Sequence, residues 1–174
     1  VPAYRLPREL IRREVAVIQA LGVEIRTGVE VGKDVSFATL RRDYAAIVVA
    51  VGAKRARGLG LPGENGPGIF GGVDLLRAVS LGEPMPLGRD VVVIGGGNVA
   101  YDVARTVVRQ AALDAARTAA RLPETRGVRL VSLETLEEMP ADTTEILEGD
   151  EEGGERLNGW GPTEILRDGA GAVT

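Results

Sequence analysis

The sequence predicts an α/β fold, because strand-like and helix-like segments alternate along the chain. Two apolar runs, residues 45–51 and 90–94, have the length and composition of strands that are buried in a parallel sheet. Apolar residues recur at helical spacing over residues 8–21 and 99–121. Alternation of this kind is typical of parallel sheets that carry helices on their faces.

A connector divides the chain into two expected domains. Glycine and proline are frequent between about residue 58 and residue 88, and segments of this composition commonly join domains. We therefore expect one domain over residues 1–87, which includes the connector, and a second domain over residues 88–174.

The first domain is expected to contain three helices and two strands. Gly22 follows the first helix and stops it, and the hydroxyl of Ser36 can cap the second helix. In order, the expected elements are helix 8–21, strand 23–26, helix 36–42, strand 45–51 and helix 73–80.

The second domain is expected to open with a strand, a glycine turn and a long helix. Pro123 ends that helix, and Asp168 with Gly169 forms a hairpin-turn signal near the end of the sequence. The acidic stretch over residues 148–155 is expected to be a mobile loop. In order, the expected elements are strand 90–94, helix 99–121, strand 128–133, helix 142–148, strand 155–160 and strand 162–167.

Composition excludes several classes of function. The 174 residues include no Cys and no His, so disulfides, Cys-held iron–sulfur clusters, Ser–His–Asp hydrolysis and HExxH zinc chemistry are excluded within this window. We expect no metal site and assign no catalytic side chain, so any reaction must rely on a cofactor. The net charge of −4 argues against binding nucleic acid or an anionic membrane. No apolar run approaches the roughly 20 residues that span a bilayer, and a cytoplasmic location is the default.

The glycine turn is the strongest signal for function. It follows an apolar strand and opens a helix, where tight turning and close approach to a pyrophosphate both disfavour a Cβ. The helix then presents free N–H groups and a positive dipole end to that anion. The alternative is a tight strand-to-helix turn that binds no ligand. The residues assigned to the dinucleotide are Gly95, Gly96, Gly97, Asn98, Val99 and Ala100.

Glu134 is the candidate for choosing between NADH and NADPH. It follows the second strand of this domain, where the adenosine ribose is expected, although the long helix makes its spacing from the turn exceed the usual figure of about 20 residues. A carboxylate accepts hydrogen bonds from a free 2′-hydroxyl and repels a 2′-phosphate, so NADH is favoured over NADPH. The only Arg nearby is Arg129, inside the strand. The alternative is a solvated charge at the end of a strand.

Several motifs in one order resemble a known family almost from end to end. These motifs are VPAYRLP over residues 1–7, LGVE over 21–24, the segment 44–53, LPGE over 61–64, GGGNVAYDVART over 95–106 and EEMPA over 137–141. By these motifs the chain resembles the FAD-dependent NAD(P)H oxidoreductases typified by the small (beta) subunit of glutamate synthase and the matching domains of dihydropyrimidine dehydrogenase.

The resemblance implies a partial flavin-type three-layer domain followed by a partial Rossmann NAD(P)-binding domain. It also implies contacts with FAD in the first domain, from Arg5, from the backbone of Val31, and from a turn where the chain crosses between the two domains. That turn consists of Val51, Gly52 and Ala53. The turn over residues 96–100 matches the family's NAD(P)H pyrophosphate site.

By resemblance, the parent protein passes hydride from NAD(P)H to FAD and electrons onward to an iron–sulfur centre or a partner subunit. The family's FAD fingerprint and its iron–sulfur segment are expected outside this chain, so we expect the chain alone to carry little FAD and to self-associate through exposed apolar edges. The alternative functions are a non-catalytic dinucleotide-binding or assembly module, and a structural interaction domain that binds no nucleotide.

Overall fold

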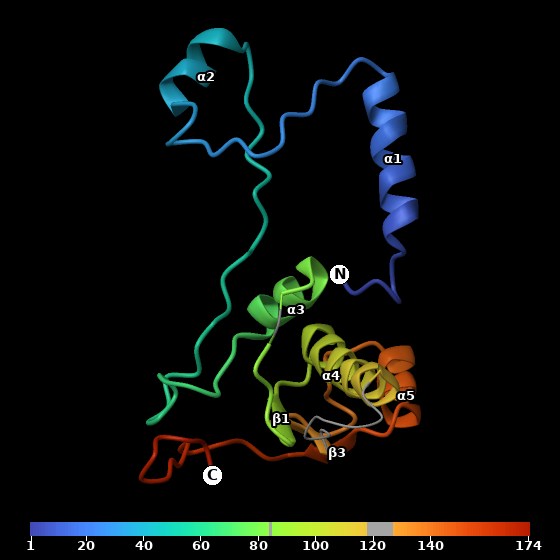
Figure 1. Ribbon diagram of the computed structural model, residues 1–174, viewed down its shortest axis with the longest axis vertical. Coiled ribbons are helices and arrows are strands. Elements are labelled where there is room, and N and C mark those ends of the chain that lie inside the picture. Colours follow the sequence, from blue (N-terminus) through green and yellow to red (C-terminus); the bar gives the residue numbers. More distant parts are fainter. Residues whose placement is uncertain (84, 118–126) are drawn as a thin grey trace. The chain divides into compact units, whose positions relative to one another are not determined.

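The computed structural model describes residues 1–83, 85–117 and 127–174, and these form two compact units (Figure 1). One unit is Ala3–Lys54, and the other comprises Val1–Pro2 and Arg55–Thr174. The division into domains by cofactor at residue 87 stays a prediction. Within the described ranges, no helix combines the length and the apolar character that a membrane span requires.

The larger unit contains a three-stranded parallel sheet, in agreement with the predicted α/β fold. Its strands are β1 (Asp90–Ile94), β2 (Gly127–Ser132) and β3 (Glu155–Asn158), in the spatial order β1-β2-β3. Val93 pairs with Leu130 between the first two strands, and Val131 pairs with Leu157 between the last two. The predicted strands 90–94, 128–133 and 155–160 are therefore confirmed, with ends that differ by up to two residues.

Helix α4 (Asn98–Arg117) lies against β1 and β2 and forms the core with them (Figure 1). Its buried residues Ala100, Tyr101, Val103, Ala104 and Val107 recur at helical spacing, and Val107 is only 1% exposed. The predicted end of this helix, near Arg121 and Pro123, lies outside the described residues.

Helix α3 (Gly72–Leu81) agrees with the predicted helix 73–80 and packs on α4. Its first residue is a glycine at the point of closest approach, where a Cβ on Gly72 would lie 3.1 Å from Cγ2 of Val103. Leu75 of α3 is 3% exposed and belongs to the same core. The absence of a side chain at Gly72 thus lets the two helices meet closely.

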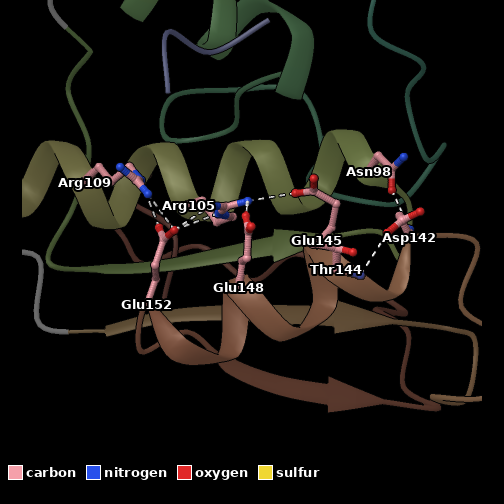
Figure 2. Close-up of polar contacts among 8 residues, drawn as sticks. All are labelled: Asn98, Arg105, Arg109, Asp142, Thr144, Glu145, Glu148 and Glu152. Atoms are coloured by element: carbon pink, nitrogen blue, oxygen red, sulfur yellow. Dashed lines mark hydrogen bonds and ion pairs between the residues drawn. The ribbon is translucent and has the colours of Figure 1, made fainter. Parts of the chain in front are cut away.

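Helix α5 (Thr143–Glu151) is capped at its N-terminus by Asp142, whose side chain accepts a hydrogen bond of 2.9 Å from the N–H of Thr144. The helix extends further than the predicted 142–148. The expectation of an acidic loop over residues 148–155 is therefore wrong for residues 148–151, which are helical, and for Glu155, which begins β3. Repulsion between Glu148 and Glu152 does not prevent the helix, because Arg105 of α4 pairs with both carboxylates (Figure 2).

An ion cluster joins α5 to α4. Arg105 of α4 is 4% exposed, and its guanidinium lies 2.8 Å from Glu145, 2.7 Å from Glu148 and 2.7 Å from Glu152. Arg109, one turn further along α4, lies 2.8 Å from Glu152. Figure 2 shows Arg105 among the three carboxylates and Arg109 pointing toward Glu152. This pairing explains why an acidic sequence can form a helix against the core.

The charge state of Glu152 follows from its two partners. Burial raises the pKa of Glu152, but hydrogen bonds from Arg109 and Arg105 outweigh burial and hold that pKa below its ordinary value. A carboxyl whose pKa is lowered on folding stabilises the fold above its ordinary pKa. This contribution is lost as the pH falls through the lowered pKa.

The last segment of the chain is not the predicted strand 162–167. It lies along the connector, where the N–H of Ile165 donates to the carbonyl of Pro62 at 3.0 Å, and it forms only one antiparallel bridge, between Arg167 and Val173. The Arg167 guanidinium donates to the carbonyls of Pro67 and Gly171, each at 2.7 Å. Side-chain hydrogen bonds to loop carbonyls therefore hold this segment in place of a strand ladder.

The hairpin turn predicted at Asp168 and Gly169 is wider than two residues. Oδ1 of Asp168 accepts hydrogen bonds of 2.9 Å from the N–H groups of Ala170 and Ala172. The glycine with a positive φ is Gly171, at +83°, and not Gly169. Asp168 thus closes a longer loop with its own side chain.

The smaller unit contains two helices, α1 (Arg8–Ala20) and α2 (Phe37–Asp43), close to their predicted positions. Ser36 caps α2 by accepting a hydrogen bond of 3.0 Å from the N–H of Thr39. The predicted strands 23–26 and 45–51 are wrong, since neither segment forms a ladder within Ala3–Lys54. A strand requires a neighbouring strand for its N–H and C=O groups, and Val48 is accordingly 88% exposed.

The ion cluster yields a prediction about stability. Replacing Arg105 by Met should lower the free energy of unfolding by roughly 3–5 kcal/mol, because it removes the buried cation that pairs with Glu145, Glu148 and Glu152. Urea denaturation followed by circular dichroism measures this change.

Arg109→Met is the matched control, because the Arg109 side chain is 45% exposed. Its loss should cost no more than about 1 kcal/mol. Equal losses in the two variants would show that burial of Arg105 does not give the cluster its importance.

Candidate functional site

The glycine turn lies where the sequence places it, between a parallel strand and a helix. β1 ends at Ile94 and α4 begins at Asn98, so three glycines make the whole connection. Gly95 has a φ of +137°, and its N–H donates to the carbonyl of Val131 on β2 at 2.8 Å. A positive φ favours glycine, and this hydrogen bond fixes the start of the turn to the neighbouring strand.

Four consecutive backbone N–H groups of the turn are unpaired. Those of Gly96, Gly97, Asn98 and Val99 donate to no acceptor in the described part of the chain, whereas the N–H of Ala100 donates to the carbonyl of Gly97 at 2.9 Å. Such donors are inherent to the start of an α-helix, where the positive end of the helix dipole also lies. The turn can therefore bind an anion through its backbone.

The three glycines differ in what the fold demands of them. A Cβ on Gly95 would be strained by its φ, and a Cβ on Gly96 would lie 2.6 Å from Oε2 of Glu134 and 3.2 Å from Cβ of Ser132. A Cβ on Gly97 would meet nothing within 4 Å, and its φ is not in the left-handed region. The described part of the chain therefore gives no steric or conformational reason for a glycine at position 97.

Ala100 occupies the position where the fingerprint requires a small residue. It is 9% exposed, and its Cβ lies 3.4 Å from the point where a Cβ on Gly95 would be. A larger side chain there would separate the start of α4 from the end of β1. The predicted packing role of Ala100 thus has a direct geometric reason.

Glu134 and the glycine turn lie side by side after the adjacent strands β2 and β1. The hypothesis that Glu134 contacts the adenosine ribose requires this arrangement. The half-buried Glu134 follows β2, and its carboxylate lies over Gly96. That carboxylate accepts no hydrogen bond from the residues that the structure describes. Arg129, the only predicted nearby cation, lies 2.6 Å from Glu155 of β3, and this hydrogen bond raises the pKa of Arg129. Arg129 therefore already has an anionic partner.

Asn98 has a role that sequence reasoning missed. Its Oδ1 accepts a hydrogen bond of 2.8 Å from the backbone N–H of Asp142, the residue that caps α5 (Figure 2). The Asn98 side chain thus connects the glycine turn to the end of the EEMPA motif, while the backbone N–H of Asn98 stays available. Asn98 and Asp142 both lie in or next to motifs that the sequence shows, which hinted at a role for them. No pattern in the sequence indicates that these two residues contact each other.

Glu64, at the end of the LPGE motif, also has a structural role. Its carboxylate accepts hydrogen bonds from the backbone N–H groups of Leu59 at 2.7 Å and Gly60 at 2.6 Å. These bonds lower the pKa of Glu64. The motif therefore closes a loop of the connector through its acidic residue.

The residues predicted to contact FAD lie in the smaller unit. Arg5 is half-buried in the turn before α1, Val31 is 55% exposed and bridges to Val35, and Val51 is 71% exposed. Gly52 has a φ of +71°, as a small-residue turn requires, and Ala53 follows it. No hydrogen bond joins Val31 to residues 51–53 among the described residues, so their shared role stays a prediction.

A small cavity lies elsewhere in the larger unit. Its lining residues include Tyr101, Arg105, Gly149 and Arg156, and none of the turn residues. It belongs to the contact region of α4, α5 and the sheet. The candidate site is therefore defined by the turn and Glu134, and not by this cavity.

The sequence of this chain is similar to those of known proteins. The family described as pyridine nucleotide-disulphide oxidoreductase matches residues 9–150. The chain is similar to the NADPH-Fe(3+) oxidoreductase subunit beta of Geobacter sulfurreducens, with 35% identity over 100% of this chain and 24% of that protein. It is also similar to the NADPH glutamate synthase small chain of Escherichia coli, with 31% identity over 100% of this chain and 36% of that protein.

A solved structure extends the likeness to the fold. FprA of Mycobacterium tuberculosis in complex with NADPH has a TM-score of 0.64 and 26% identity, over 84% of this chain and 36% of that chain. The chain thus spans between 24% and 36% of the length of these three proteins. Because the family match covers residues 9–150, most of the sequence, this chain belongs to the pyridine nucleotide-disulphide oxidoreductase family.

Proposed function

We propose that this chain supplies the pyridine-nucleotide site of an FAD-dependent NAD(P)H oxidoreductase. The observation that carries the proposal is the row of unpaired N–H groups from Gly96 to Val99 at the start of a helix of 20 residues. A pyrophosphate offers the acceptors and the negative charge that these groups and the helix dipole favour. Gly97 leaves the backbone open to that approach.

The chain's own residues bind and orient in this proposal. The turn holds the pyrophosphate, Ala100 keeps the helix close to the strand, and Glu134 contacts the adenosine ribose. Bound NAD(P)H supplies the reducing electrons for FAD, which can release them singly to a one-electron acceptor. No acid–base side chain is needed for this positioning role, which agrees with a sequence that has no His and no Cys.

The partner in this proposal is an electron-accepting subunit or an iron–sulfur centre. Two of the similar proteins are named as a subunit beta and a small chain, which supports a place in a larger assembly. Contacts of Arg5, Val31 and residues 51–53 with FAD belong to the same proposal, as does a cytoplasmic location. The similarity of the whole chain to these proteins supports the FAD contacts.

Preference for NADH over NADPH is the finer part of the proposal, and it depends on Glu134. Its carboxylate over the turn suits a ribose 2′-hydroxyl, and Arg129 is paired with Glu155. The similar proteins give this preference no support, since each of the three is named with NADPH. The relative affinity for the two nucleotides therefore needs a direct measurement.

Gly97→Ala tests nucleotide binding at the turn. It should leave the melting temperature nearly unchanged, because the added Cβ meets no protein atom within 4 Å. It should weaken NADH binding by about tenfold or more, since the Cβ stands where the pyrophosphate approaches. Fluorescence of Trp160, the single tryptophan of the chain, can follow the titration.

Two further glycine variants serve as controls. Gly169→Ala adds a Cβ in open space away from the turn, so stability and binding should both be unchanged. Gly95→Ala should lower stability by about 1–2 kcal/mol because of its φ of +137°. If Gly97→Ala binds NADH as tightly as the unaltered chain, the pyrophosphate does not lie at this turn.

Glu134→Arg tests the preference for NADH. The unaltered chain should bind NADH more tightly than NADPH, and the variant should shift the ratio of the two dissociation constants toward NADPH by about tenfold, or about 1.4 kcal/mol. Glu137→Arg makes the same charge change at an exposed position of the same segment and should leave the ratio unchanged. Tighter binding of NADPH by the unaltered chain would show that Glu134 does not set the preference.

A further inference from the structure

The carbonyl of Glu134 is held by three donors. It accepts hydrogen bonds from the hydroxyl of Ser132 at 3.0 Å, from the backbone N–H of Gly159 at 3.1 Å and from Nδ2 of Asn158 at 3.5 Å. Two of these donors come from the end of β3 and the residue that follows it. The position of the Glu134 backbone is therefore set by the neighbouring strand, although Glu134 lies in a loop.

Asn158 makes the widest set of these contacts. Its Nδ2 also lies 3.2 Å from Oγ of Ser132 and 3.3 Å from Sδ of Met139. Ser132 is 1% exposed and Met139 is 9% exposed, and the hydroxyl of Tyr101 on α4 donates to the same sulfur at 3.6 Å. One amide thus ties the end of β2 and the segment over residues 133–141 to β3, and through Met139 to α4.

The Glu134 carboxylate depends on this backbone anchor. No described residue donates a hydrogen bond to the carboxylate itself, yet Oε2 lies over Gly96, at 2.6 Å from the place of a Cβ there. A shift of the Glu134 backbone would move the carboxylate along the turn. The orientation of the Glu134 carboxylate toward a bound ribose thus depends on the side chains of Ser132 and Asn158, which hydrogen-bond to the Glu134 carbonyl.

We infer that Asn158 is a positioning residue, which acts through Glu134 to set how tightly the site binds the adenosine ribose and which nucleotide it prefers. This inference rests on the proposed function of the glycine turn. Asn158 itself contacts no nucleotide in this account. The Asn158 amide donates a hydrogen bond to the Glu134 carbonyl. This contact helps to fix the backbone of Glu134, whose side chain contacts the nucleotide.

A double-mutant cycle tests the inference. Binding of NADH and of NADPH to the full chain is measured by calorimetry for the unaltered protein, Glu134→Gln, Asn158→Ala and the double variant. Each single variant should weaken NADH binding by about fivefold and move the ratio of the two dissociation constants toward one. The double variant should bind no more weakly than Glu134→Gln alone, because Asn158 has no effect once the carboxylate is gone.

Asn65→Ala is the matched control. Asn65 is exposed in the connector, and its side chain makes no hydrogen bond within the described residues, so both dissociation constants should be unchanged. Melting curves establish that the variants are folded. If Asn158→Ala does not fold, Asn158→Ser retains a donor on a shorter side chain, and the same cycle is judged by the same criterion.

The outcomes separate the inference from the proposed function. If the effects of Glu134→Gln and Asn158→Ala multiply in the double variant, or if Asn158→Ala leaves the nucleotide ratio unchanged, Asn158 is not a positioning residue and the nucleotide site stands. If the unaltered chain binds neither nucleotide, the proposed function is wrong and the inference falls with it.

Discussion

A strand that passes into a helix through only three residues leaves the first N–H groups of that helix without carbonyl partners. In this chain β1 and α4 meet in this way, and the constraint governs much of what surrounds them. Gly95 must turn with a positive φ, and Ala100 must be small so that α4 can lie on the sheet. The unpaired N–H groups that result make the turn suited to binding an anion, which can accept hydrogen bonds from all of them together.

Helix α4 organises the larger unit from this starting point. One face builds the core with β1, β2 and α3, another face carries Arg105 and Arg109 toward α5, and the first residue binds Asp142 through its side chain. These contacts place the EEMPA segment next to the turn. The same segment contributes Met139 to the contacts of Asn158, so the loop that bears Glu134 is held from both sides. The proposed nucleotide site thus consists of the turn, the end of β2 and the end of β3.

The sequence predicted those elements whose partners are encoded nearby, and it failed where partners lie elsewhere. The strand 90–94, the turn and α4 were predicted because an apolar run, three glycines and a helical pattern follow one another directly. The run over residues 45–51 has the same apolar composition, but a strand also needs a neighbour, and Ala3–Lys54 supplies none. The helical conformation of residues 148–151 was missed because Arg105, which pairs with Glu148 and Glu152, is on another helix. Asn158 gave no signal, since its importance arises from contacts across the sheet.

In the proposed function, the unpaired N–H groups of Gly96, Gly97, Asn98 and Val99 bind the nucleotide. Amide NMR of the ¹⁵N-labelled chain during titration with NADH tests this most directly. These four amide signals should shift furthest, while those of Gly95 and Ala100, which already donate to carbonyls, should shift less. Binding of NADH that leaves the four signals unmoved, with the largest shifts elsewhere in the chain, would contradict the claim.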